Sequence, residues 1–482
     1  MRPKLPLRVA VVGLLLTATF SPAAAQSEYH WSDQFGNKST LLNGTVIGGV
    51  SDLGAVYYNP GRLARLLRPG FLLTAEAFEV NHVSVKIGQG DREQMEQASF
   101  RGIPSLVAGM FTLPSLPGHR FAYSFLTRRR FDSNLFLTAE ERGDFLPESP
   151  GEETYVSTWE AESKLDENWV GLSWAHEVSP RLSVGISTFG TYLGRRRRAD
   201  LNGTMLTSTQ EASIHSRLRE YRFQSFGLLW KAGLAVEVAP FRIGLSITTP
   251  EITAFGTSSI RYEDRLIPPR SPGGNPLGAE VLVFQEKGLE VTTHSPFAVG
   301  AGISWIRPRA ELHLSGEWFS GVAEYRITGA DSIASQSSGD LSEYEVVDEL
   351  KSVINLGAGI ELQVSQAFSA YGSIIRDASA APKNLYRPFA FESRVSNSIS
   401  QADGFYVGAG VSFEAKWIDL TAGVSYGATR ETIENPLAGQ NSAVGQAIPA
   451  AGQLESTRRR WRFLLGFTIP MVEGISNGPM AR

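Results

Sequence analysis

The sequence contains no cysteine among its 482 residues. Such a chain has no disulfide framework, no thiolate metal site and no cysteine nucleophile. Beyond its N-terminal segment it has no apolar run of about 18 residues, which excludes a bundle of transmembrane helices. The net charge of -4, with positive residues only in small clusters, gives no broad basic face and makes nucleic acid an unexpected partner.

The N-terminus has the pattern of a secretory signal. Three cations precede an apolar run from Val9 to Phe20, and Ala23-Ala24-Ala25 follows shortly after it. The run is shorter than the roughly 20 residues of a spanning helix, so we expect cleavage after Ala25. Residues 1–25 are therefore predicted to be a signal peptide, and the mature chain would begin at Gln26.

Apolar and polar residues alternate over long stretches of the remaining chain. Every second residue between Ile354 and Leu362 is apolar, and the same period recurs over residues 405–413, 418–426 and 461–469. A period of two is that of a β-strand with two different faces. The runs reach the roughly nine to eleven residues that a tilted membrane strand requires, so they favour a membrane barrel over a soluble sandwich.

Short turns alternate with long polar segments, as in outer-membrane barrels. Adding a first strand at about 71–88 and a last strand at about 457–469 to six hairpins predicts fourteen strands, with both termini in the periplasm. Segments 255–290 and 433–455 are interpreted as external loops. The predicted fold is all-β: a 14-stranded antiparallel transmembrane β-barrel over residues 71–470 in the outer membrane, followed by a periplasmic tail, 471–482. The six short turns are expected near residues 114–118, 178–180, 239–240, 307–308, 365–366 and 415–416.

The segment before the first strand, residues 26–70, has no run long enough to be a membrane strand. A barrel of fourteen strands is wide enough to be either filled with water or plugged. We therefore predict that residues 26–70 form an N-terminal plug, or hatch, inside the lumen. The alternative is a disordered arm in the periplasm.

Part of this segment resembles a known family. Residues 51–64 read Ser-Asp-Leu-Gly-Ala-Val-Tyr-Tyr-Asn-Pro-Gly-Arg-Leu-Ala, which is similar to the hatch motif of the FadL/TodX outer-membrane transporters of hydrophobic compounds. The motif centres on Asn59, Pro60 and Gly61, and here Gly61 and Arg62 replace the usual Ala and Gly. The resemblance implies a monomeric barrel that takes up long-chain fatty acids or hydrocarbons passively and releases them through a gap in the wall or past the hatch.

Arginine clusters are the candidate polar contacts. Arg128, Arg129 and Arg130 interrupt the alternation of the third strand, so at least one of them should point inward as a clamp for a ligand carboxylate. Lipopolysaccharide phosphates are the alternative ligand of these arginines. They are also the expected contact of the clusters at 195–198 and 458–460. The expected partners are thus outer-membrane lipid and lipopolysaccharide, a hydrophobic small molecule and the outer-membrane assembly machinery.

Two alternative functions remain open from the sequence. His313 and Ser315 lie two residues apart on one strand face, as in outer-membrane phospholipases, but no Asn follows the serine and the alternation places both in the lumen. We therefore predict no enzyme, no catalytic residue, no metal and no cofactor. A secretion or surface-docking component of the same fold is the other alternative.

Overall fold

The computed structural model describes eight parts of the chain. The predicted signal peptide and C-terminal tail lie outside them, as does most of segment 433–455. The described residues are 29–66, 70–87, 95–144, 151–268, 278–382, 394–398, 402–434 and 453–470.

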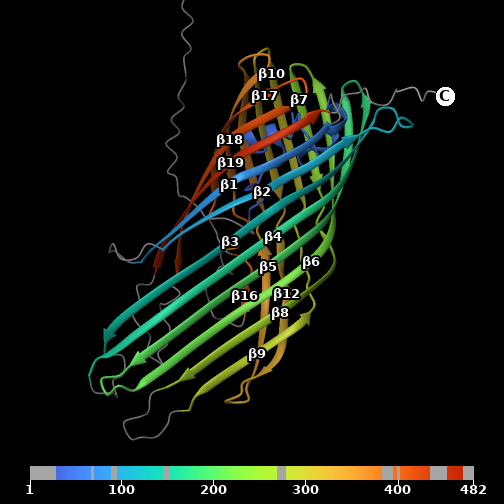
Figure 1. Cartoon of the computed structure of the whole chain (residues 1–482). Coiled ribbons are helices and arrows are strands. Elements are labelled where there is room, and N and C mark those ends of the chain that lie inside the picture. The colour runs from blue at the N-terminus through green and yellow to red at the C-terminus, as the bar shows by residue number, and fades with distance from the viewer. Residues whose placement is uncertain are drawn as a thin grey trace, which may run out of the picture.

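Fourteen strands close into an antiparallel barrel (Figure 1). The ring closes where β1 pairs with β19, from Gly70 opposite Pro470 to Ile87 opposite Leu454. The predicted strand number and all six short turns are confirmed. In ring order the strands are β1 (Gly70–Ile87), β2 (Met95–Phe111), β3 (His119–Gly143), β4 (Glu153–Ser179), β5 (Leu182–Leu206), β6 (Ala212–Val238), β7 (Phe241–Thr248), β10 (Ala298–Arg307), β11 (Ala310–Phe319), β14 (Val353–Gln363), β15 (Phe368–Asp377), β17 (Gly404–Glu414), β18 (Asp419–Glu434) and β19 (Gln453–Pro470).

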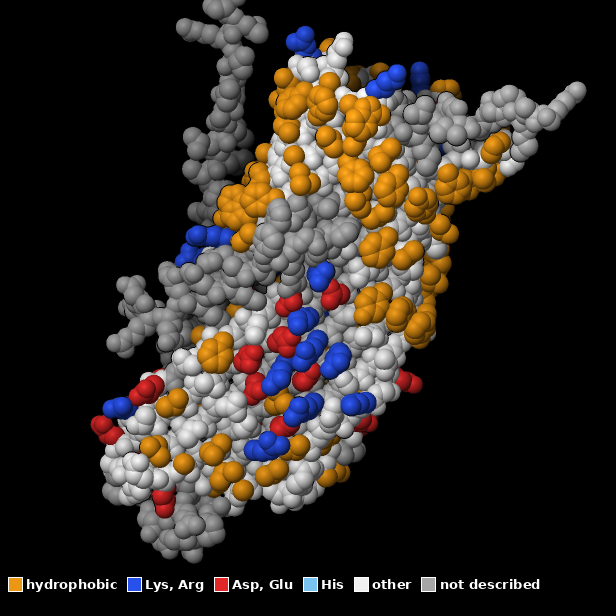
Figure 2. All heavy atoms as spheres, in the orientation of Figure 1, with side chains coloured by type: hydrophobic (Ala, Val, Ile, Leu, Met, Phe, Trp, Pro, Cys, Tyr) orange, Lys and Arg blue, Asp and Glu red, His pale blue; other side chains and the backbone are white. Residues whose placement is uncertain are grey.

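The alternation in sequence becomes an alternation between the two faces of the wall. Along β4, buried residues alternate with half-buried or exposed ones, and exposed positions such as Val170 and Leu172 are apolar. Figure 2 shows apolar side chains gathered on the part of the outer wall near the short turns, with Lys, Arg, Asp and Glu over the part beyond it. The outer surface therefore has an apolar zone and a charged extension. No helix in the described parts of the chain has the length and apolar character to cross a membrane.

The charged extension is built by unusually long strands. β4 and β6 have 27 residues each and β3 and β5 have 25, against the roughly 9–11 that cross a bilayer. Because β7 has only eight residues, it pairs with β6 over Lys231–Val238 alone, and β8 (Ile252–Ile267) pairs with the outer part of β6. β9 (Glu280–Leu289) then pairs with β8. Segment 255–290, expected to be a loop, thus contains a hairpin that covers a free strand edge.

A second, three-stranded sheet lies beyond the membrane part of the barrel. It consists of β12 (Val322–Ala334), β13 (Leu341–Leu350) and the short β16 (Arg394–Ser396). Its apolar residues, among them Ile327, Val346 and Val395, form one buried cluster with Tyr221 and Phe223 of β6. The extended wall and this sheet therefore share a core outside the membrane zone.

Residues 29–66 lie inside the ring. They contain α1 (Asn37–Leu41), α2 (Ala55–Tyr58) and the 3-10 helix η1 (Pro60–Arg65), and nearly all of them are buried. Their hydrogen bonds reach strands on different sides of the ring: Asn37 Nδ2 donates to Thr468 Oγ1 at 2.9 Å, and Ser373 Oγ donates to the Leu41 carbonyl at 2.9 Å. On a further side, Asn59 Nδ2 donates to the Leu234 carbonyl of β6 at 3.0 Å. We call residues 29–66 the plug segment.

Candidate ligand cavity and plug contacts

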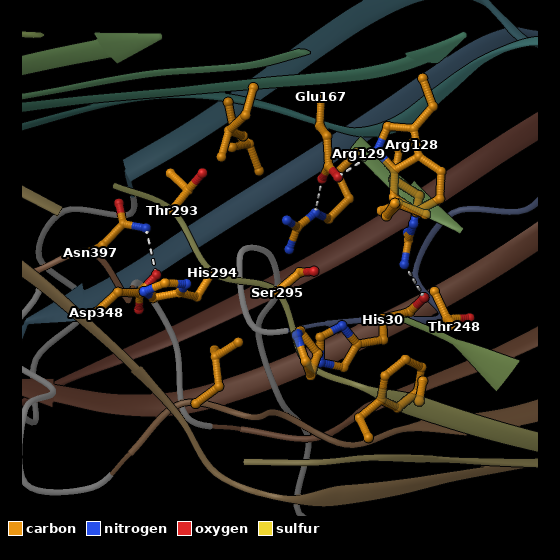
Figure 3. A pocket seen from close by; sticks show the side chains of 18 of the residues that line it. His30, Arg128, Arg129, Glu167, Thr248, Thr293, His294, Ser295, Asp348 and Asn397 are labelled. Atoms are coloured by element: carbon orange, nitrogen blue, oxygen red, sulfur yellow. Dashed lines mark hydrogen bonds and ion pairs between the residues drawn. The ribbon is translucent and has the colours of Figure 1, made fainter. Parts of the chain in front are cut away.

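A cavity of about 100 Å³ lies between the plug segment and the extension of the wall (Figure 3). Its lining mixes aromatic and aliphatic side chains with a few polar groups, which is the usual composition of a small-molecule site. The apolar lining includes Tyr57, Leu165, Trp169, Leu193, Phe223, Leu229, Phe319, Tyr325 and Ile327, and the charged lining includes Arg128, Arg129, Glu167, Lys231, Glu317 and Asp348.

A β-bulge brings two neighbouring arginines to this cavity. The register between β3 and β4 shifts between Thr127 and Arg129, and the extra residue lets successive side chains face the same way. Arg128 is buried and lines the cavity together with Arg129. Arg130 lies on the outer face, where it pairs with Asp166 at 3.2 Å. The structure therefore places two of the three predicted clamp residues at the cavity.

Arg128 differs from the other cavity cations in how its charge is balanced. Its guanidinium lies over the rings of Tyr57 and Trp169, 5.4 and 5.5 Å from their centroids, and Nη2 donates to the His30 carbonyl at 2.9 Å. Within the described residues, Nη1 has no hydrogen-bond partner. A buried guanidinium held by aromatic faces with one nitrogen unsatisfied is suited to bind a polar or anionic oxygen.

The other cations at the cavity, Arg129 and Lys231, are paired with carboxylates. Arg129 Nε donates to Glu167, and Trp169 Nε1 donates to the other oxygen of that carboxylate at 2.8 Å. Lys231 Nζ lies 3.3 Å from Glu317, with both side chains buried. These pairs leave Arg128 as the cation that a ligand can reach without breaking an ion pair.

His30 of the plug segment closes one side of the cavity. Its ring stacks on Phe319 with centroids 4.1 Å apart, and Figure 3 shows it beside Arg128. Burial, and then the charges of Arg129 and Arg128, lower the pKa of His30 well below its usual value. The imidazole is therefore neutral at pH 7 and presents an uncharged aromatic face.

The wall beside Arg128 is not continuously paired. β2 and β3 pair only over Leu106–Phe111 and Phe121–Leu126, whereas β2 stays paired with β1 as far as Met95. Pro104 has no N–H to donate to a neighbouring strand, and the β3 bulge follows at Arg128. Figure 1 shows β2 and β3 separating toward their ends away from the short turn that joins them. The inter-strand hydrogen bonds therefore stop at the level of the cavity.

The motif residues Asn59, Pro60 and Gly61 dock the plug segment onto the wall. Asn59 is fully buried; its Nδ2 donates to the carbonyls of Ile47 and Leu234, both at 3.0 Å, and its Oδ1 accepts the Gly61 N–H at 3.1 Å. Pro60 begins η1, where its missing N–H costs no helical bond. A Cβ on Gly61 would lie 2.8 Å from the carbonyl oxygen of Gly233, so this approach of two backbones requires glycine.

The end of the barrel near the short turns contains a larger recess of about 740 Å³. Arg62 of the plug segment pairs there with Glu237, and Arg65 pairs with Glu177. Because these pairs join the plug segment to strands of the wall, they add electrostatic contacts to the motif described above. The plug segment thus separates the recess from the cavity.

The other arginine clusters point in both directions. Arg195 and Arg197 are buried and donate to the carbonyls of Asn397, Ser396 and Ser398, whereas Arg196 pairs with Glu220 on the outer face. In the other cluster Arg460 pairs with Asp33 of the plug segment at 2.6 Å. Only alternate members of each cluster therefore face outward, as strand alternation requires, so the expectation that whole clusters face lipopolysaccharide does not hold for the buried members.

His313 and Ser315 face the plug segment and not the lipid. Ser315 Oγ accepts the Ile47 N–H at 3.2 Å, and His313 Nδ1 lies 2.8 Å from Ser304 Oγ. The predicted position of His313 and Ser315 on the lumen side of the wall is confirmed. The two side chains are engaged by different neighbours, as in a polar packing network and not in a nucleophile and base pair.

No protein-family model matches the sequence, and no curated protein matches it either. Solved structures of similar fold include a Pseudomonas aeruginosa FadL homologue, with a TM-score of 0.56 and 11% identity, covering 92% of this chain and 99% of that one. The P. putida toluene transporter TodX also gives 0.56 and 11%, covering 92% and 100%. The Ralstonia pickettii toluene transporter TbuX gives 0.52 and 13%, covering 91% and 99%. Over its whole barrel, the chain has the fold of the FadL/TodX outer-membrane transporters.

Proposed function

We propose that this protein is an outer-membrane channel of the FadL/TodX type for the passive uptake of hydrophobic molecules. The observation that carries the proposal is the aromatic-lined cavity beside a plug segment that lies inside the barrel. A general porin for hydrophilic solutes needs an open aqueous channel, whereas here residues 29–66 lie inside the barrel and nearly all of them are buried. The similar solved structures named for toluene transport support the same class of function.

The cavity favours a compact substrate with a polar end. An engineered cavity of about 150 Å³ holds benzene, so a space of about 100 Å³ is on the scale of one small ring or part of an acyl chain. Arg128 would bind a carboxylate or hydroxyl oxygen, and the aromatic lining would bind the apolar part. Long-chain fatty acids belong to this class, but most of the acyl chain would have to extend outside the cavity.

Two exits are compatible with the geometry. A molecule bound at Arg128 lies beside the place where β2 and β3 stop pairing, so it could leave sideways into the apolar zone of the membrane. The other exit leads past the plug segment into the recess near the short turns. The first exit requires no displacement of the buried Asn59 contacts.

Uptake in a deletion strain tests the proposal. Cells lacking the gene, complemented with the wild type, Arg128→Gln or Arg130→Gln, would be given labelled toluene and a labelled long-chain fatty acid at low concentration. We expect the wild type to restore uptake of at least one of the two compounds. If acid uptake is restored, Arg128→Gln should lower it roughly tenfold, since a hydrogen bond to a charged group contributes about 1.5–3 kcal/mol.

Arg130→Gln is the matched control because Arg130 lies on the outer face, away from the cavity. It should support wild-type uptake of both compounds. Equal uptake with and without the gene, for both compounds, would contradict the proposed function. Equal loss in the two variants would contradict the role assigned to Arg128.

A further inference from the structure

Three potential metal ligands meet on the inner face of the barrel, away from the ligand cavity. They are Glu311 and His313 of β11 and Glu361 of β14, and one ligand atom from each lies within 4.8 Å of the other two. Glu311 and Glu361 are direct cross-strand partners in the β11–β14 pairing. Like charges placed opposite each other destabilise a sheet, and a bound cation would reduce this repulsion.

The histidine supplies an independent observation. His313 is 2% exposed, and its Nε2 has no hydrogen-bond partner among the described residues. The same nitrogen lies 3.9 Å from Glu311 Oε1, so it is directed at the carboxylates. A buried imidazole nitrogen without a partner normally costs free energy, and a metal ion bound by the nitrogen and both carboxylates would remove that cost.

The surrounding groups are arranged as outer contacts of such a site. Ser304 Oγ lies 2.8 Å from His313 Nδ1 and orients the ring, and Tyr371 Oη donates to Glu361 at 3.1 Å. Contacts of this kind fix the ligands of metal sites in proteins. Arg242 Nη1 donates to both oxygens of Glu311 at 3.0 Å. This guanidinium offsets one carboxylate charge, and the remaining lone pairs of Glu311 are still open to a metal ion.

We propose that Glu311, His313 and Glu361 form a binding site for a first-row divalent cation such as Zn²⁺ at the contact between the plug segment and the wall. One imidazole and two carboxylates match the ligand preference of Zn²⁺. Ligand atoms on a tetrahedral Zn²⁺ lie about 3.3 Å apart, so the three side chains, now within 4.8 Å of one another, need to close in by at most about 1.5 Å on binding.

The position of the site connects it to the plug segment. A Cβ on Gly49 would lie 2.2 Å from Ser304 Oγ and 2.8 Å from Glu311 Oε1, so the plug backbone passes directly over these groups. Arg242, which contacts Glu311, also lines the recess at the end with the short turns. Bound metal would therefore stiffen the wall where the plug segment rests on it.

Titration of the purified full-length barrel, without an affinity tag, with ZnCl₂ tests this inference. Isothermal titration should show one Zn²⁺ per chain, and Co²⁺ should give the visible absorption of a nitrogen- and oxygen-ligated ion. His313→Ala and Glu361→Gln should each weaken Zn²⁺ binding at least about tenfold, because each removes one of three ligands. His119→Ala, which removes a histidine paired with Trp174 on the opposite wall, should bind like the wild type.

Folding of each variant is checked by the faster migration of an unheated, folded barrel on a gel. If His313→Ala does not fold, the Zn²⁺ binding of Glu361→Gln is the deciding measurement. Absence of Zn²⁺ binding by the wild type at millimolar concentration would overturn the inference, as would unchanged binding in a folded His313→Ala or Glu361→Gln variant. These outcomes are independent of uptake, so the metal site and the transport function stand or fall separately.

Discussion

At the scale of single residues, His30 shows how the plug segment is tuned to its surroundings. The imidazole stacks on Phe319 near two arginines, and its pKa is lowered by burial first and then by Arg129 and Arg128. The unfolded chain binds a proton near the usual pKa of 6.5, whereas the folded chain excludes it. The contribution of His30 to stability is therefore complete above pH 6.5 and is lost progressively as the pH falls below it.

His30→Phe should remove this pH dependence, since phenylalanine keeps the stacked ring and cannot be protonated. Between pH 7.5 and 5.5 the wild type should lose up to about 1.4 kcal/mol more unfolding free energy than the variant, which is the value of one pH unit below the unfolded pKa. Urea unfolding in detergent at the two pH values measures the difference. Equal losses in the two proteins would show that His30 becomes protonated without unfolding.

At the scale of elements, the ring strands and short turns could be predicted from the sequence. The reason is that each face of a ring strand keeps one environment, lipid outside or lumen inside, along its length. On β14, for example, Leu356 faces outward and its neighbour Asn355 faces inward. Residues of the two kinds therefore continue to alternate along the strand. The hairpin β8–β9 was missed because it belongs to the extension, where no lipid imposes apolar residues on the outer face. Its alternation is correspondingly weak, with Tyr262 and Glu263 side by side and both largely covered.

The candidate sites were predictable only in part. A run of three arginines signalled that the alternation breaks in β3, but which of them face inward depends on the bulge between Thr127 and Arg129. The cluster of Glu311, His313 and Glu361 gave no local signal, since Glu361 is distant in sequence and the β11–β14 register alone brings it opposite Glu311. Sequence periodicity identifies the faces of a strand, and strand register determines which residues meet.

Gly61 allows the backbone of η1 to pack closely on β5 and β6. Gly61→Ala should destabilise the packed plug segment by about 1–3 kcal/mol, because its Cβ would meet the backbone oxygens of Gly233 and Ser183 at 2.8 and 3.1 Å. Protease cleavage within residues 29–66 of the folded barrel should become faster. Gly278→Ala is the matched control, since nothing lies within 4 Å of its Cβ. Identical cleavage of the two variants would contradict the assigned role of Gly61.

At the scale of the whole molecule, the plug segment and the wall define two competing exits. The plug segment is held by buried hydrogen bonds on several sides of the ring, including Asn59 to Leu234 and Asn37 to Thr468. The wall, in contrast, shows no β2–β3 ladder pairing beyond Leu106 and Leu126 in the part of the chain that the structure describes. Release through the wall therefore disrupts fewer contacts than release past the plug segment, provided that the gap can widen during passage.

Pairs of introduced cysteines can separate the two exits, and the absence of native cysteine leaves each pair as the only thiols. Ser105→Cys with Thr127→Cys would bridge β2 and β3 one step beyond their last pair, and Asn37→Cys with Thr468→Cys would tie the plug segment to β19, where the side chains already touch at 2.9 Å. We expect the first bridge to slow uptake of labelled substrate at least several-fold, with recovery on reduction, and the second to change it little. If instead the β2–β3 bridge left uptake unchanged and the bridge between the plug segment and β19 slowed it, release would occur by movement of the plug segment.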